Sequence, residues 1–183
     1  MDAIDAIQSR ASAPKLDAPG PGKDDLSVIL RSGIRAPDHG RLTPWRFVVI
    51  EGAGIEVLGN AMADLRKRSF PDATADSLES ERAKARRAPT IIVVAARVDH
   101  SSKVPEIEQI LSAAASAQNV FLTAHALGYG AMWKTGDAAY DPILKETIGL
   151  SPNDHIVGFM YIGTAVVKGH IKPLELRDYV THL

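Results

Sequence analysis

The sequence predicts a fold of the α+β class or a three-layer α/β arrangement, in which helices cover a single sheet. Four apolar runs bounded by turn residues have the length and composition of strands, and they lie at 45–50, 90–98, 130–136 and 155–165. About five other segments repeat apolar residues every three or four positions, which is typical of helices. The 183 residues can bury one core, so we expect a single domain over 1–183.

Two helices are expected before the first strand. The first covers 2–10, where two isoleucines stand three positions apart, and the run of prolines and glycines at 14–22 ends it. Asp24 or Asp25 can cap the second helix. Pro37 closes that helix, because the residue before a proline is pushed towards extended geometry.

A helix and a strongly polar segment lie between the first two strands. Apolar residues at three- and four-residue spacing predict a helix from 55 to about Lys67. The segment 69–88 is the most polar part of the chain. It can be a mobile lid with a helical second half or a solvated excursion, and the sequence leaves both open. The basic runs 66–68 and 86–87 are expected to face solvent.

The second half of the chain begins with a central strand, 90–98, which is a near-continuous apolar run. The longest helix, over 105–127, follows; its middle consists of small residues, so another backbone can pack closely against it. Its expected apolar face is formed by Ile107, Ile110, Leu111, Ala114, Ala117, Phe121 and Ala124. A short helix starts at Asp141-Pro142, where an N-cap precedes a proline at the first helical position. The last strand leads into a tail, 166–183.

Composition excludes several functional classes. The 21 basic and 22 acidic residues nearly balance, so no overall positive field favours nucleic acid. There is no cysteine to serve as nucleophile or metal ligand, and the six histidines never fall at metal-ligand spacing, so no metal site is expected. No apolar run approaches the roughly 18 residues of a membrane span, and the N-terminus is unlike a secretory signal. We expect a cytoplasmic protein that contacts neither membrane nor nucleic acid.

Two glycine-containing motifs fail as nucleotide sites. The run GPGKDD at 20–25 has the Gly-Lys pair of a phosphate loop, but it lacks the following Ser or Thr and the preceding strand. The run from Gly128 to Gly136 lacks the third glycine of a dinucleotide fingerprint and follows a helix. His125, on the long helix, is expected to be a packing residue.

Three separated stretches share one chemical character. They combine cations, hydroxyl groups and aromatic rings, and they are SRAS at 9–12, the run from Arg35 to Trp45, and MWKTG at 132–136. Guanidinium groups bind phosphate in a bidentate manner, and flat apolar side chains suit an aromatic ring. The stretches therefore indicate an anionic aromatic ligand. The alternative is that the cations lie on the surface while Trp45 and Trp133 belong to the core.

In order and spacing, these stretches resemble the FMN-dependent nitroreductase family, and in particular its shortest branch, the minimal NAD(P)H nitroreductases. The likeness covers nearly the whole chain. The family has an Arg-Arg-Ser type opening, an Ala-Pro-Ser turn leading to Gln-Pro-Trp, a Gly-x-Gly before a tryptophan, and a late Gly-Phe-x-x-x-Gly strand. The residues here are Arg10-Ala11-Ser12, Ala36-Pro37-Asp38 with Thr43-Pro44-Trp45, Gly128, Gly130 and Trp133, and Gly158-Phe159 with Gly163.

The resemblance implies a fold, a cofactor and an assembly. The fold would be an α+β three-layer sandwich whose central sheet is mixed but mainly antiparallel. The protein would be a homodimer that binds FMN at the subunit interface, with contacts divided between the two chains, and the tail 166–183 would embrace the partner. The cofactor-binding residues carried over are Arg10, Ala11, Ser12, Arg35, His39, Trp133, Lys134 and Thr135.

The implied activity is that of an NAD(P)H oxidoreductase. Hydride would pass from the nicotinamide to flavin N5 and then, in ping-pong fashion, to a nitroaromatic, quinone or similar acceptor. No catalytic side chain is assigned, since the flavin carries the redox chemistry. Lys134 would stabilise the anionic reduced flavin, and the segment 69–88 would set the size of the acceptor. Two alternatives stay open: a flavin-binding storage or delivery module with little turnover, and a structural protein that binds no flavin.

Two positions depart from the family pattern. Arg41 stands where many relatives have asparagine, and Thr43 stands where many have glutamine. Both amides normally contact the flavin, so those two contacts are not carried over to this chain.

Overall fold

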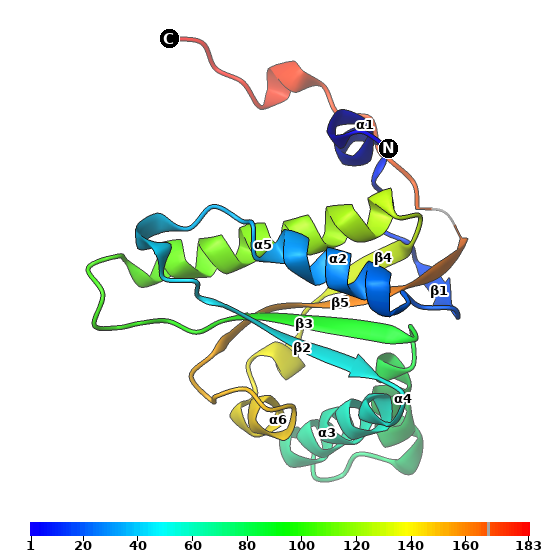
Figure 1. The fold of residues 1–183 in the computed structure, drawn as a ribbon. Coiled ribbons are helices and arrows are strands. Elements are labelled where there is room, and N and C mark those ends of the chain that lie inside the picture. The colour runs from blue at the N-terminus through cyan, green and yellow to red at the C-terminus, as the bar shows by residue number, and fades with distance from the viewer. Residues whose placement is uncertain (168) are drawn as a thin grey trace.

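The computed structural model describes residues 1–167 and 169–183; Lys168, which falls in the predicted tail, lies outside the described residues. Five strands form one sheet (Figure 1). Every strand pairing among the described residues is antiparallel, and the order is β1-β5-β3-β2, with β4 also paired to β5. The strands are β1 (Lys15–Asp17), β2 (Trp45–Glu51), β3 (Thr90–Ala96), β4 (Gly130–Lys134) and β5 (His155–Val167).

Helices cover both faces of this sheet, as Figure 1 shows. One face carries α2 (Lys23–Gly33) and α5 (Glu106–Ala126), and the other carries α3 (Ala53–Ser69), α4 (Ala75–Ala85) and α6 (Pro142–Thr147). The short helix α1 (Ala3–Ser9) lies beside the C-terminal part of α5. The α+β class with a mainly antiparallel sheet between helical layers is confirmed.

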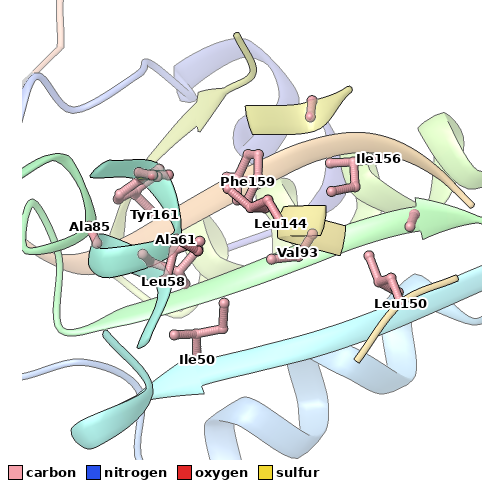
Figure 2. Packing of buried hydrophobic residues seen from close by; sticks show 14 of the residues in the cluster. Ile50, Leu58, Ala61, Ala85, Val93, Leu144, Leu150, Ile156, Phe159 and Tyr161 are labelled. Atoms are coloured by element: carbon pink, nitrogen blue, oxygen red, sulfur yellow. The ribbon is translucent and has the colours of Figure 1, made fainter. Parts of the chain in front are cut away.

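The two layers of core lie on opposite sides of β3, all seven residues of which are buried. Because side chains alternate along a strand, Ile91 and Val93 pack towards α3 and α6, while Ile92 and Val94 pack towards α2 and α5. Figure 2 shows the first cluster, with Leu58 of α3, Leu144 of α6 and Phe159 of β5 gathered around Val93. This double burial explains why the strand is a continuous apolar run.

Several elements differ from the sequence prediction. The strands β3 and β4 end at Ala96 and Lys134, each two residues before the expected end. The strand β1 was not expected, since three residues are too few to show a period. Gly22, and not Asp24 or Asp25, is the N-cap of α2, and it makes no side-chain cap bond. The strand β5 continues two residues beyond the expected end, to Val167.

The predicted apolar face of α5 is wrong in its first half. Ile107 and Leu111 are 59% and 57% exposed, whereas Gln109 is buried. The side-chain amide of Gln109 accepts from the backbone N–H of Asp99 and donates to the carbonyl oxygens of Asp99 and Val104. A polar residue therefore faces inward because the preceding loop supplies its hydrogen bonds.

The polar segment 69–88 contains the helix α4. One of the two sequence alternatives, a mobile lid, included a helix in the second half of this segment. This helix packs closely on α3: a Cβ added at Gly59 would lie 3.1 Å from the carbonyl oxygen of Arg82. Ala85 is fully buried. Movement of this segment stays a prediction.

The tail after β5 is exposed from His170 to Leu183 and contains one short 3-10 turn, η3 (Leu176–Asp178). Figure 1 shows it extending away from the sheet, past α1. Within the part of the chain described, no helix is both long and apolar enough to cross a bilayer.

Candidate functional site

The first predicted stretch follows the end of α1. Arg10 is the C-cap of that helix, and its guanidinium carbon lies 4.8 Å from the centroid of the Phe121 ring on α5. The Nη1 atom of Arg10 is buried and has no hydrogen-bond partner among the described residues. A buried cationic donor without a partner is uncommon and costly, so it marks a place where an anion would be stabilising.

His125 of α5 connects to the same corner. The Ser9 hydroxyl donates to the Asp5 carbonyl oxygen at 2.5 Å, so its oxygen accepts from His125 Nε2 at 2.9 Å. Burial, with the nearby positive charge of Arg10, lowers the pKa of His125. The histidine is thus a packed residue with a hydrogen-bond partner, as expected from its place in the sequence.

Ala11 and Ser12 lead from α1 to the sheet. Ala11 is half-buried and Ser12 is exposed. Directly after them, the backbone N–H of Ala13 donates to the carbonyl oxygen of Ala131 on β4, at 2.9 Å. Gly169 lies against Ala11 and the Ser12 carbonyl group so closely that a Cβ there would clash. The first and third predicted stretches are therefore neighbours.

The third stretch alternates across the sheet. The indole of Trp133 faces α5: its ring meets Phe121 edge-on with centroids 6.4 Å apart, and Nε1 donates to the Val157 carbonyl oxygen at 3.2 Å. Met132 and Lys134 point to the opposite face. The side chain of Trp133 therefore belongs to the core, and its contact with a flavin stays a prediction.

A hollow of about 390 Å³ opens beside β4, and we call it the β4 hollow. Residues from two parts of the chain line it: Ala13 and Pro14, which directly follow the first stretch, and Lys134 of the third stretch. Its remaining lining residues are Leu16, Arg87, Met132 and Tyr161.

A second hollow, of about 140 Å³, lies between the C-terminal half of α3, the helix α4 and the turn η2 (Asp137–Ala139). We call it the α4 hollow. It contains the predicted residue Thr135 and shares Arg87, Lys134 and Tyr161 with the β4 hollow. The two hollows are therefore adjacent along the end of β4.

Sequence reasoning missed Arg87 and Tyr161. Arg87 was expected only to face solvent, but it borders both hollows, whereas its neighbour Arg86 is held in ion pairs with Glu56 and Glu79. Burial raises the pKa of Tyr161 to about 12, against an opposing effect of Arg87. The only signal for Tyr161 was its place in an apolar strand, which does not separate a site residue from a core residue.

Within one chain, His39 lies apart from the other site residues, whereas Arg35 follows Ser32, which is hydrogen-bonded to Asn119 and Thr123 of α5. Arg35 is exposed after α2, and His39 begins the turn η1 (His39–Arg41), where its Nδ1 pairs with Glu108 of α5. Glu108 and Phe121 are thirteen positions apart on α5, which corresponds to about 20 Å along a helix axis. His39 therefore lies far from the Arg10 corner.

The two positions that depart from the family pattern are conformationally unusual. Arg41 and Thr43 have φ angles of 56° and 48°, and they are the described non-glycine residues with positive φ. The Asp38 carboxylate holds this turn by accepting from the Thr43 backbone N–H at 2.7 Å. A β-branched residue such as Thr43 is disfavoured in this region of backbone conformation.

The described residues contain no group of three His, Asp or Glu side chains able to hold a metal ion. The site offers cations, an apolar wall and two hollows, with no pairing of a nucleophile and a base. This chemistry suits the binding of an anionic, partly apolar molecule.

Comparisons with known proteins agree on one family. Residues 7–164 match the model of the nitroreductase family. A protein of Escherichia coli K12 named "Putative NAD(P)H nitroreductase YdjA" is 38% identical over 169 residues, which are 92% of this chain and 91% of that protein. A nitroreductase-like protein from Bacillus cereus superposes with a TM-score of 0.82 at 24% identity, covering 100% of this chain and 96% of that one. A protein from Desulfovibrio desulfuricans, described as "a putative nitroreductase in complex with fmn", superposes with a TM-score of 0.78 at 22% identity, covering 100% of this chain and 98% of that one.

Proposed function

Because the chain belongs to the nitroreductase family of oxidoreductases, we propose that it is an FMN-dependent NAD(P)H oxidoreductase acting on a nitroaromatic, quinone or similar acceptor. The observation that carries the proposal is Arg10, whose buried Nη1 lacks a partner among the described residues, at the corner where the first and third stretches meet. The FMN complex of the Desulfovibrio neighbour and the NAD(P)H in the name of the E. coli relative support the choice of cofactor and donor.

The residues present fit FMN. Arg10 would hold the phosphate, because a guanidinium is the best side-chain partner for a phosphate group. Ala11 and Ser12 would add main-chain and hydroxyl contacts beside it. The β4 hollow has room for a ring system and is lined by Lys134, while Thr135 lines the adjacent α4 hollow. When bound, the flavin would supply hydride transfer between the nicotinamide and the acceptor.

Lys134 is the cation we assign to the pyrimidine edge of the flavin. It is exposed and has no ion-pair partner among the described residues, so its charge is available to an anion. A lysine there would favour the negative charge that reduction places on the ring. No side chain of the hollows is assigned as a general base.

A second copy of the chain would complete the site. His39 lies about 20 Å from the Arg10 corner along α5, so it would reach a flavin there from the partner subunit. We assign the exposed Arg35, which lies four residues before His39, to the same partner contribution. The exposed apolar residues Ile107 and Leu111 on α5 offer a surface for such a contact. The tail after β5 makes few contacts with its own chain and would embrace the partner.

Anaerobic rapid mixing of the flavin-loaded protein with NADH and with NADPH tests this function. We expect one of the two nicotinamides to bleach the flavin quickly, and a nitroaromatic or quinone to restore its colour in a separate second phase. A flavin that both nicotinamides reduce only slowly would contradict the proposal and favour the storage module.

A further inference from the structure

The α4 hollow has a charge pattern of its own. Four cationic side chains line it, namely Arg66, Lys84, Arg87 and Lys134, against the two acids Glu81 and Asp137. Among the residues that the structure describes, one of these acids is ion-paired: Lys84 Nζ lies 2.5 Å from Glu81 Oε2. The hollow therefore carries excess positive charge, which favours an anion.

Arg66 is the cation best placed to bind a ligand in this hollow. Its guanidinium carbon lies 3.9 Å from the centroid of the Phe70 ring, which orients the planar group. Its Nε atom is buried and has no hydrogen-bond partner among the described residues. A fixed guanidinium with a free donor is suited to a carboxylate. The sequence alone had assigned this arginine to solvent.

The rest of the lining is apolar and the space is small. Met62, Leu65 and Phe159 supply apolar lining, and Phe70, which also lines the hollow, is half exposed. A volume of about 140 Å³ suits a single six-membered ring with its substituent, whereas the larger β4 hollow suits a ring system of several rings. The apolar and cationic lining residues, together with the small volume, suit a small molecule that has an apolar ring and a negative charge.

We infer that the α4 hollow binds a small aromatic carboxylate, with Arg66 as the main carboxylate contact and Lys84 in support. If the proposed function holds, this ligand is the electron acceptor, since the hollow shares Arg87, Lys134 and Tyr161 with the β4 hollow. The reaction would then be the two-electron reduction of a nitrobenzoate to a nitrosobenzoate. One N–O bond breaks, the oxygen leaves as water, one further proton is taken up, and NAD(P)H becomes NAD(P)⁺.

The binding test uses benzoate and benzamide, which have the same shape but differ in charge and cannot be reduced. Each is titrated, with NMR detection, into flavin-free and flavin-loaded protein. We expect benzoate to bind at least about tenfold more tightly than benzamide, and Arg66→Gln to remove most of that preference. Lys67→Gln is the matched control, because Lys67 is also a cation in the last turn of α3 but does not line the hollow. A melting curve of each variant establishes that it is folded, and Lys84→Met serves as a second variant.

Two outcomes would overturn the inference. One is equal binding of benzoate and benzamide. The other is displacement of benzoate by FMN, which would show that the α4 hollow is part of the flavin-binding site. Benzoate binding that depends on Arg66, in a protein that takes up no FMN, would instead uphold the anion site and remove the proposed function. In turnover, we expect kcat/KM for 4-nitrobenzoate to fall about tenfold in Arg66→Gln while that for 4-nitrobenzamide and the affinity for FMN stay unchanged.

Discussion

The guanidinium group of Arg10 stacks over the ring of Phe121, 4.8 Å from its centroid, and thereby fixes the end of α1 against α5. The ring satisfies one face of the cation, but it offers no acceptor in the plane of the N–H groups, and Nη1 stays without a partner among the described residues. This relationship presents an oriented donor at the point where the chain turns towards β4. The proposed contact with the FMN phosphate depends on this donor.

Replacing Arg10 with alanine should weaken FMN binding by about 1.5–3 kcal/mol, the loss typical of a hydrogen bond to a charged group. Affinity can be measured from the quenching of flavin fluorescence. Riboflavin, which lacks the phosphate, is the control ligand, and its affinity should change little. An equal loss for FMN and riboflavin would argue that Arg10 supports the ring or the fold and does not contact the phosphate.

Much of the fold could be predicted because long elements carry clear periods. The strands β2, β3 and β5 and the helix α5 were all located from apolar spacing, whereas β1 is too short to show one. The buried face of α5 was mispredicted near its start because Gln109 is buried there. Its side chain is hydrogen-bonded to the backbone of the loop before the helix, and no apolar spacing in the sequence signals these bonds. Burial of a satisfied polar residue cannot be read from hydrophobicity.

The site was less predictable than the fold. Arg10 and Lys134 stood out because they are cations within distinctive motifs. Arg87 and Tyr161 did not, since an arginine in a polar segment and a tyrosine in an apolar strand usually have structural roles. Trp133 was assigned to the site with its motif, but strand alternation turns its indole towards α5. Which face a residue occupies depends on the register of β4, which no local motif reveals.

A mixture of two inactive variants tests whether the flavin contacts are shared between subunits. Arg10→Ala and Arg35→Ala should each bind FMN weakly as separate homodimers. When the two proteins are unfolded together and refolded, each heterodimer should contain one site with both arginines, so part of the tight binding returns. The measurement is the bound FMN after gel filtration. No recovery in a mixture that demonstrably forms heterodimers would place both arginines in the same chain's site or exclude Arg35 from it.

A charge in the middle of α5 should prevent dimer formation. Ala114 is half-buried and lies on the side of α5 that exposes Ile107 and Leu111. The substitution Ala114→Glu would place an unpaired carboxylate in a contact between two helices, where desolvation is costly. Sedimentation should show monomers or aggregates, while Val57→Glu, on the opposite layer, leaves the assembly unchanged. A normal dimer of Ala114→Glu would show that α5 is not at the interface.

Thr43 should be replaceable with a gain in stability. Its φ of 48° is unfavourable for a β-branched residue, and asparagine tolerates this conformation better. The substitution Thr43→Asn is expected to raise the free energy of unfolding by about 0.5–1 kcal/mol. Urea denaturation measures the change, and Thr74→Asn, at an N-cap with ordinary φ, is the control. A loss of stability in Thr43→Asn would mean that the threonine side chain has a compensating contact.

The buried carboxylate of Asp154 should make the free energy of unfolding decrease at acidic pH. Burial alone would raise the pKa of Asp154, but hydrogen bonds from Arg97, at 2.9 and 2.8 Å, and from the Ser151 backbone N–H hold it below the ordinary value. The folded pKa lies below the unfolded one, so this contribution is present above about pH 4 and is lost as the pH falls through the folded pKa. The difference in unfolding free energy between wild type and Asp154→Asn should therefore shrink on acidification, when followed by urea titrations at a series of pH values. A constant difference would contradict this assignment.

The most direct measurement is a titration of FMN into the purified, flavin-free chain, with the visible absorbance of bound flavin followed and the assembly weighed by light scattering. We predict one FMN per chain and two per dimer, with binding that is weakened when either Arg10 or Arg35 is replaced. A protein that stays colourless at saturating FMN, or that binds the flavin equally well as a monomer, would contradict this prediction.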